Sequence, residues 1–241
     1  QFPIGHILPL WQKGENLLGK YADLDSAIGF LSEEAEYGIL QSELVMADGG
    51  LLMTEKEKML AGMLYNANGD VELIRERAAC KDLCQELNQI QPSQGEEQRM
   101  LLRKLLGTIC GSFEIVTPFW CDYGYNISIG DNFFMNHNGV ILDAAQVTFG
   151  NNVFIGPNCG FYTAGHPLDA VQRRQGMEYA RPITIGNDVW IGGGVQVVPG
   201  VTIGDNVVIG AGSVVTRDIP SGVVAAGSPC RVLRAITADD R

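Results

Sequence analysis

The sequence predicts a mainly β fold in which short strands stack as a solenoid, preceded by a helical region. Two observations predict it: a six-residue repeat in the C-terminal half, and a glycine-poor, charged stretch over residues 53–110. A short strand that turns a corner every six residues cannot bury its apolar face alone, so several coils must stack to form a core. An antiparallel sandwich would instead space its strands about 8–12 residues apart. The shorter, regular period therefore favours the solenoid.

Residues 1–52 form an extension to which we assign no role. A weak amphipathic pattern runs over residues 24–39, and "ADGG" separates the extension from the helical region. No basic region precedes an apolar block, so we expect no secretory signal, and no apolar run approaches the ~20 residues of a membrane-spanning helix. Deletion of the extension is expected to leave activity nearly intact.

Residues 53–112 are expected to hold three helices. Thr54 and Glu57 form a capping box at the start of the first helix. Asp70 can cap the second helix, and the third is expected from about residue 96 to residue 109. An apolar stripe marks one side of the third helix: Leu101, Leu102, Leu105 and Leu106.

Residues 113–236 carry the repeat. Aliphatic residues open hexads at Val147, Val153, Ile183, Val189, Val195, Val201 and Val207. We expect each of these side chains to point into a narrow core, while Gly, Asn and Asp relieve the backbone at the corners. A short tail, residues 237–241, comes after the repeat.

The repeat is interrupted over residues 160–182, which contain a histidine, two prolines and a burst of charge. Cys159 and Ile183 are four hexads apart, so the phase of the repeat survives the interruption. This spacing predicts a loop that is pushed out of a continuing solenoid, with the strands on either side undisturbed.

Charge and cysteine content limit the partners. The formal net charge is -11, which argues against a nucleic-acid partner because such binding requires a basic face. None of the six cysteines belongs to a CxxC pair, so we expect scattered free thiols in a reducing compartment and a cytoplasmic protein. The cysteines are Cys80, Cys84, Cys110, Cys121, Cys159 and Cys230.

Over roughly residues 53–236 the chain resembles the maltose and galactoside O-acetyltransferases, a family of hexapeptide-repeat acyltransferases. The motifs that carry the resemblance are "TEKEKMLAGMLY", "CDYGYNISIGDNFFMNHN", "YTAGHPLDA", "ITIGNDVWIGGG", "GVTIGDNVVIGAGSVVTRDIP" and "VVAAGSPCRV". The resemblance implies a left-handed parallel β-helix, although parallel crossovers are usually right-handed.

The resemblance also implies an activity and an assembly. It predicts acetyl-CoA as co-substrate and transfer of the acetyl group to a hydroxyl of a sugar such as maltose, glucose or a galactoside. It further predicts a homotrimer with active sites between neighbouring solenoids, in which the extruded loop reaches toward the next subunit.

His166 is the predicted catalytic base. A sugar hydroxyl is a poor nucleophile at neutral pH, so a base must take its proton as it attacks the thioester carbon, and histidine suits this task. The family's base occupies the His of "GHP", which is His166 in this chain.

Three polar residues match family positions that contact the acceptor or steady the site: Asn136, Asp143 and Asp122. The galactoside branch carries a second acidic residue directly after the position of Asp143, where this chain has Ala144. This difference favours the maltose-type branch and leaves the acceptor open.

The remaining site residues are assigned to acetyl-CoA. The N–H of Gly193 is expected to stabilise the developing oxyanion, and a glycine there allows close approach. Arginine guanidinium groups suit the phosphates of the coenzyme. The predicted coenzyme contacts are Gly193, Ala211, Thr216, Arg217, Arg231, Arg234 and Trp190.

Four alternatives stay open. Some β-helix proteins are zinc carbonic anhydrases with three histidine ligands, but one of the three histidines here, His6, lies in the extension, so no metal is expected. A Cys–His nucleophile would need Cys159 or Cys230. The chain could also be a non-catalytic trimeric scaffold, or an enzyme that acetylates an amino sugar or an oligosaccharide intermediate.

Overall fold

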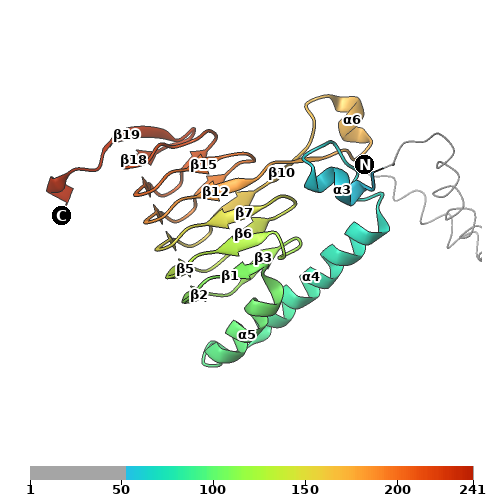
Figure 1. The fold of residues 1–241 in the computed structure, drawn as a ribbon, viewed down its shortest axis with the longest axis horizontal. Coiled ribbons are helices and arrows are strands. Elements are labelled where there is room, and N and C mark those ends of the chain that lie inside the picture. Colours follow the sequence, from blue (N-terminus) through green and yellow to red (C-terminus); the bar gives the residue numbers. More distant parts are fainter. Residues whose placement is uncertain (1–52, 241) are drawn as a thin grey trace, which may run out of the picture. The chain divides into compact units, whose positions relative to one another are not determined.

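The computed structural model describes residues 53–240, and the predicted extension, residues 1–52, lies outside the described residues. Three helices open the described chain (Figure 1): α3 (Glu55–Leu60), α4 (Val71–Gln89) and α5 (Gly95–Leu105). The predicted capping box is confirmed at α3, where the side-chain oxygen of Thr54 accepts a hydrogen bond from the Glu57 N–H at 3.1 Å. The Glu57 carboxylate in turn accepts one from the Thr54 N–H at 2.7 Å.

The third helix is shorter than the sequence predicted. It ends at Leu105, and Thr108–Ile109 forms the first strand, β1. The N–H of Gly107 donates to the Gly124 carbonyl, and a Cβ at this glycine would stand 2.1 Å from the Tyr125 carbonyl oxygen. The chain must therefore leave the helix here to pass close to its neighbour. No helix among the described residues is long and apolar enough to cross a membrane.

The rest of the chain winds into a left-handed parallel β-helix with three sheets, as predicted (Figure 1). One sheet, the hydroxyl face, contains β1, β4 (Ile127–Ile129), β7 (Val147–Phe149), β12 (Ile183–Ile185) and β15 (Thr202–Ile203). A second, the aromatic face, contains β2 (Phe113–Ile115), β5 (Phe133–Met135), β8 (Phe154–Ile155), β13 (Trp190–Ile191), β16 (Val208–Ile209), β18 (Val223–Ala226) and the antiparallel β19 (Arg231–Ala235). The third, the mixed face, contains β3 (Phe119–Cys121), β6 (Gly139–Leu142), β9 (Gly160–Tyr162), β14 (Gln196–Val197) and β17 (Val214–Val215).

The faces take their names from the side chains that point outward in register. Outward positions on the hydroxyl face are Thr108, Ser128, Thr148, Thr184 and Thr202. Those on the aromatic face include Phe134, Phe154, Trp190, Val208 and Val224. Alternate side chains point inward and are buried, as expected for a strand with one face on the core.

Three aromatic rings from successive coils pack together in the core. Phe149 makes edge-to-face contacts with Phe133 and Phe161, at ring-centroid distances of 5.1 and 5.0 Å. All three side chains are at most 2% exposed.

Asparagines build the corners between the faces. Asn132 and Asn152 adopt positive φ of 54° and 57°, and the side chain of the first donates to that of the second at 2.9 Å. Asn152 donates in turn to Asp188, which also has positive φ. Such left-handed residues suit Asn and Asp, and their stacked side chains link successive coils.

The interruption is a loop extruded from a continuing solenoid, as predicted. Val147 of β7 pairs directly with Ile183 of β12, so the sheet continues past the loop. Asn152 and Asp188, which stack at one corner across the loop, are 36 positions apart. Asn187 and Asp205, a stacked pair at the same corner in the next coil, are 18 positions apart, so the loop adds residues without breaking the stack. The loop contains a two-stranded ladder of β10 (Ala164–Gly165) and β11 (Tyr179–Ala180), and the short helix α6 (Ala170–Arg174). A 3-10 turn, η3 (Ala238–Asp240), ends the described chain.

Candidate active site

Eight of the eleven predicted site residues lie at two different corners of the coils, and the other three lie on strands. The corner between the mixed and hydroxyl faces, here called the loop corner, carries His166, Asp122, Asp143, Thr216 and Arg217. The corner between the aromatic and mixed faces, here called the amide corner, carries Asn136, Gly193 and Ala211. The four-residue strand β6 of the mixed face separates the two corners, which corresponds to about 13 Å of extended chain.

The extruded loop holds the His166 ring in one orientation. His166 directly follows β10, and its Nδ1 lies 3.0 Å from the carbonyl oxygen of Met177 on the returning side of the loop. A carbonyl can only accept a hydrogen bond, so Nδ1 carries the proton and donates it. In the neutral ring Nε2 then has a free lone pair. The imidazole is exposed, and Nε2 is thus available as a base.

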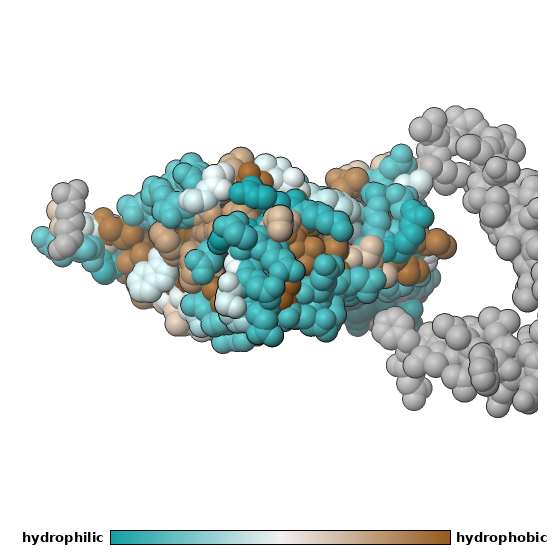
Figure 2. Space-filling view, turned by 90° about the horizontal axis from the view of Figure 1, so that it is seen from below, coloured by the Kyte–Doolittle hydropathy of each residue, from teal (hydrophilic) through white to brown (hydrophobic). Residues whose placement is uncertain are grey.

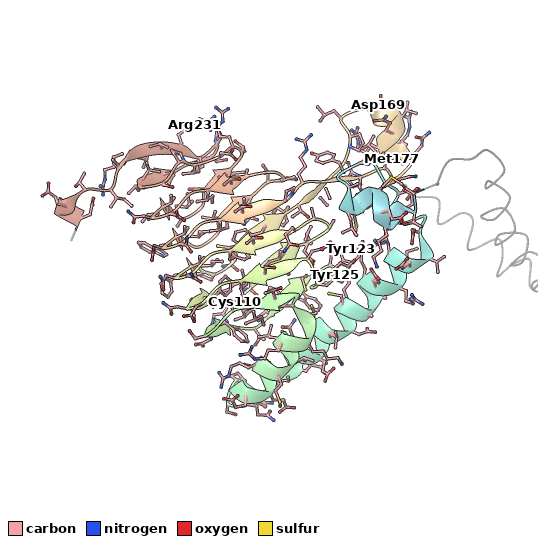
Figure 3. All side chains as sticks on the ribbon, in the orientation of Figure 1. Cys110, Tyr123, Tyr125, Asp169, Met177 and Arg231 are labelled. Atoms are coloured by element: carbon pink, nitrogen blue, oxygen red, sulfur yellow. The ribbon has the colours of Figure 1, made fainter. Side chains whose placement is uncertain are left out.

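The loop is braced close to this histidine. The guanidinium of Arg173 donates to the carbonyl oxygens of Pro167 and Leu168, both at 3.0 Å. Asp169 caps α6 by accepting from the N–H groups of two residues in its first turn. Figure 3 shows Asp169 and Met177 together in the projecting loop. These contacts favour a loop that keeps its shape.

A small polar pocket of about 140 Å³ lies at the loop corner. Its charged and phenolic lining residues come from the helical region, the strand β3 corner and the extruded loop: Tyr65, Arg77, Lys81, Asp122, Tyr123 and Glu178. Ala164, two residues before His166, also lines it. The pocket presents positive charge, carboxylates and hydroxyls together, which suits a ligand with many hydroxyl groups.

Hydrogen bonds order the pocket wall. Arg77 donates to the Tyr123 hydroxyl and to the Ala67 carbonyl, both at 2.8 Å. The Tyr65 hydroxyl donates to the Glu178 carboxylate at 3.1 Å, which joins the helical region to the loop. Sequence patterns alone do not indicate this convergence, because each of these residues has the pattern of a solvated helix or loop position.

Burial shifts the titration of the pocket groups. Desolvation raises the pKa of Asp122, and the nearby Lys81 ammonium at 3.7 Å opposes the rise. Desolvation also raises the pKa of Tyr123 to about 12 and that of Tyr65 further, so both phenols stay protonated and can donate hydrogen bonds at neutral pH.

Asp143 lies beneath this pocket and is fully buried. Its Oδ1 accepts from the N–H of Asp122 at 3.0 Å and from that of Tyr123 at 2.8 Å, while Oδ2 has no hydrogen-bond partner among the described residues. The side chain thus positions the backbone of two pocket residues and does not itself face the open pocket. Ala144, where the galactoside branch is acidic, lines the pocket instead.

The buried Asp143 makes the stability of the fold depend on pH. Burial raises its pKa to about 6, above the value of about 3.9 in an unfolded chain. The folded state therefore binds this proton more tightly, so its contribution to stability is present below pH ~4 and is lost as the pH rises to about 6. We expect the Asp143→Asn variant to gain about 2 kcal/mol of unfolding free energy relative to wild type between pH 4 and pH 7.

Urea unfolding at several pH values measures this difference. The matched control is Asp239→Asn, at an exposed position. Its unfolding free energy relative to wild type should stay constant across this pH range. If the unfolding free energy of Asp143→Asn relative to wild type is also independent of pH, the buried carboxyl does not have the raised pKa, and the prediction is contradicted.

The amide corner offers unpaired backbone donors. The neighbouring N–H groups are used, since Gly194 donates to the Pro157 carbonyl at 2.7 Å and Gly212 donates to the Gly193 carbonyl at 2.9 Å. Within residues 53–240, the N–H groups of Gly193 and Ala211 have no hydrogen-bond acceptor. They occupy equivalent positions in adjacent coils, about 5 Å apart. A ligand placed there can accept from both.

The aromatic face next to this corner is partly exposed. Trp190 and Phe154 are 59% and 42% exposed and lie in register on adjacent strands. Figure 2 shows hydrophobic and hydrophilic surface interspersed along the solenoid in the view from below. Trp190 is therefore available to pack against a bound group or a neighbouring molecule.

The predicted cations lie apart from one another. Arg231 and Arg234 are on the exposed strand β19, whereas Arg217 is at the loop corner. Figure 3 shows Arg231 well separated from Met177, whose carbonyl holds His166. The guanidinium of Arg234 already binds both carboxylate oxygens of Asp240, at 2.6 and 2.7 Å.

The two candidate nucleophilic cysteines are poorly suited to attack. Cys159 is 1% exposed and its thiol donates to the Gly192 carbonyl at 3.2 Å. Cys230 is fully buried. Desolvation raises the pKa of both thiols, so neither is a ready thiolate.

The fold and its two corners define the class of the protein, a hexapeptide-repeat acyltransferase. Residues 58–111 match the family model described as the maltose acetyltransferase hexapeptide capping motif, and residues 182–217 match that of the bacterial transferase hexapeptide with six repeats. A candidate acetyltransferase of Saccharomyces cerevisiae is 55% identical over 76% of this chain and 94% of its own.

Solved structures are also similar. A maltose O-acetyltransferase from Clostridium difficile is 50% identical and has a TM-score of 0.75, over 77% of this chain and 98% of its own. A galactoside acetyltransferase in complex with coenzyme A is 45% identical with a TM-score of 0.76, over 78% and 94% of the two chains. A Vibrio cholerae hexapeptide-repeat acetyltransferase in complex with acetyl coenzyme A is 40% identical with a TM-score of 0.71, over 77% and 100%. The chain belongs to the maltose and galactoside O-acetyltransferase family.

Proposed function

We propose that this chain transfers an acetyl group directly from acetyl-CoA to a hydroxyl of a sugar such as maltose, glucose or a galactoside, with His166 as the general base. The observation that carries the proposal is the hydrogen bond from His166 Nδ1 to the Met177 carbonyl, which leaves Nε2 free to accept a proton beside a polar pocket. The catalytic domain would comprise residues 113–236, after the helical region 53–112.

Each step of the reaction has a group in the chain that can perform it. Nε2 of His166 takes the proton of the acceptor hydroxyl as its oxygen attacks the thioester carbon. The N–H of Gly193 stabilises the oxyanion of the tetrahedral intermediate. The intermediate then expels the thiolate of coenzyme A, which takes the proton from His166. No acyl-enzyme forms, in keeping with the burial of Cys159 and Cys230.

The acceptor is assigned to the polar pocket at the loop corner. Asp122 and Glu178 can accept hydrogen bonds from hydroxyls, while Arg77 and Lys81 can donate to them. Asn136 would contact the acceptor from the amide corner of a neighbouring copy. Asp143 acts by positioning the backbone of Asp122 and Tyr123.

A homotrimer explains why the site residues lie at two corners. His166 cannot meet Gly193 of its own chain, because a strand of the mixed face lies between them. A closed threefold ring that places the mixed faces around its axis brings the loop corner of one copy against the amide corner of the next. The complete site would then form between two copies.

The coenzyme fits the exposed groups of the chain. Trp190 offers an apolar surface, and Arg231 offers a guanidinium group for phosphate. The N–H groups of Gly193 and Ala211, which have no acceptor within residues 53–240, offer donors. Thr216, Arg217 and Arg234 are assigned to the same ligand. For Arg234 to bind a phosphate, that phosphate must replace the Asp240 carboxylate.

Replacing both Arg231 and Arg234 with Ala is expected to raise the KM for acetyl-CoA by roughly 10-fold or more, because charge-assisted hydrogen bonds to phosphate are lost. The kcat should change less, since the phosphates are remote from the reacting carbon. Steady-state kinetics with varied acetyl-CoA measures both constants. Arg75→Ala, an exposed arginine on α4, is the control for the loss of positive charge. An unchanged KM in the double variant would remove these arginines from the site.

An acceptor panel tests the proposed activity. Release of the coenzyme A thiol is followed with acetyl-CoA and maltose, glucose, a galactoside, glucosamine or no acceptor. The proposal predicts release that depends on a sugar hydroxyl. Faster release with glucosamine and an N-acetyl product would favour the amino-sugar alternative, which the carboxylates of Asp122 and Glu178 could serve. No release with any acceptor would contradict the proposal.

A further inference from the structure

Three cysteines that are scattered in the sequence converge in the fold. Cys80 and Cys84 lie one turn apart on α4, and Cys121 ends β3, the strand against which α4 packs. The Sγ atom of Cys121 lies 3.5 Å from that of Cys80 and 3.7 Å from that of Cys84. All three Sγ atoms lie within 4.8 Å of one another, and no residue of the trio is more than 3% exposed. All six cysteines are free thiols, as expected, but these three lie together in the fold and are not scattered.

The spacing of these sulfur atoms matches a metal centre. Zinc–thiolate bonds of about 2.3 Å in a tetrahedron place their sulfur atoms about 3.8 Å apart. The two distances to the Sγ atom of Cys121, 3.5 and 3.7 Å, are close to this edge length. An i, i+4 pair on one helix face also presents two ligands to a single ion, as in other helical metal sites.

A disulfide would engage only two of these three sulfur atoms. Cys80 and Cys84 lie on consecutive turns of one helix, and Cys121 can form a disulfide with only one of them. The other helix cysteine would remain a free thiol. A bound metal engages all three sulfur atoms and needs no oxidant. Thiolate sulfur also selects soft or borderline ions over Mg²⁺ and Ca²⁺.

We propose that Cys80, Cys84 and Cys121 bind one Zn²⁺ ion in a buried structural site that ties α4 to β3. Binding replaces the three thiol protons, which pass to solvent. Three thiolates and one Zn²⁺ carry one net negative charge. The cations of Lys81 and Arg77, which lie on the same helix and line the adjoining pocket, offset this charge. The buried carboxylate of Asp143 lies in the same region, because it accepts from the N–H of Asp122, the residue after Cys121, and its Oδ2 has no hydrogen-bond partner among the described residues.

The site has a consequence for the pocket at the loop corner. The proposed ligands lie close in sequence to residues that line this pocket. Arg77 lies three residues before Cys80 and Lys81 directly after it, and Asp122 directly follows Cys121. A metal that fixes α4 against β3 therefore fixes two walls of this pocket relative to each other. This role does not depend on the identity of the acceptor.

Metal titration of the full chain tests the proposal. The reduced, chelator-treated protein is titrated with Zn²⁺, and separately with Cd²⁺, whose bonds to thiolate give an ultraviolet charge-transfer band. We expect one ion per chain, a band that saturates at that ratio, and a rise of several degrees in Tm with Zn²⁺. The Cys84→Ser and Cys121→Ser variants should lose the band and the rise in Tm, whereas the exposed Cys110→Ser should keep both.

The wild-type chain alone can overturn the proposal, even if a variant fails to fold. Substoichiometric Cd²⁺ binding with no charge-transfer band would show that the thiols only pack together. A disulfide between Cys121 and either helix cysteine in the freshly purified protein, found by mass spectrometry, would also contradict it. Neither readout depends on acetyl transfer.

Discussion

Replacing His166 with Ala is expected to lower kcat by about 10²–10⁴-fold, the usual contribution of a positioned general base. The geometry explains the loss, because the hydrogen bond to the Met177 carbonyl holds Nδ1 and leaves Nε2 as the group that can accept the acceptor's proton. Acetyl-CoA binding should change little, since His166 is not among the residues assigned to the coenzyme.

Thiol-release kinetics and acetyl-CoA titration measure the two effects separately. The control is His137→Gln, which changes the other described histidine, also exposed but at the amide corner, and should retain most of the activity. Near-normal turnover in His166→Ala, or a trapped acetyl-cysteine in the wild type, would contradict the proposed mechanism.

Replacing Phe149 with Ala is expected to destabilise the solenoid by about 3–5 kcal/mol, as large-to-small changes in a packed core do. The ring is 2% exposed and touches the rings of Phe133 and Phe161 edge to face, so its removal leaves a cavity that the stacked coils cannot close. Urea unfolding at fixed protein concentration measures the loss. Val71→Ala, at a position that is 81% exposed, should change the unfolding free energy by less than about 0.5 kcal/mol. A loss of similar size in both variants would mean that this part of the core is loosely packed.

The periodic features of this fold could be predicted from the sequence. The aliphatic residues that open the hexads, such as Ile183 and Val189, are buried because each occupies the same position in its coil. The extruded loop was predictable for the same reason, since it leaves the phase of the repeat intact and Val147 pairs with Ile183. A repeat constrains every coil in the same way, so local spacing carries information about the whole domain.

Contacts between distant segments could not be predicted in this way. Nothing in the spacing indicated that Arg77, Asp122 and Glu178 would line one pocket, because they come from three separate elements. Cys121 is likewise far in sequence from the two helix cysteines that it meets. The burial of Asp143 was also missed, since a corner Asp that accepts from two backbone N–H groups has the same sequence pattern as one that faces a ligand.

The division of the site between two corners is the feature on which the proposed mechanism depends most. The resemblance to the family identified these residues as one set. The strands on either side of each residue show which corner of the coil it occupies. His166 and Asp122 belong to the loop corner, whereas Asn136 and Gly193 belong to the amide corner. The proposed chemistry therefore requires two copies of the chain.

Complementation in mixed trimers tests this claim most directly. His166→Ala removes the base, and Gly193→Leu fills the approach to the amide corner, so each variant alone should be inactive. The two are co-expressed with different affinity tags, and trimers that carry both tags are isolated. If each site joins two copies, every mixed trimer has one site with both corners intact, and we expect about one third of wild-type activity. Mixed trimers that remain as inactive as either variant alone would place the whole site within one chain and contradict the proposed mechanism.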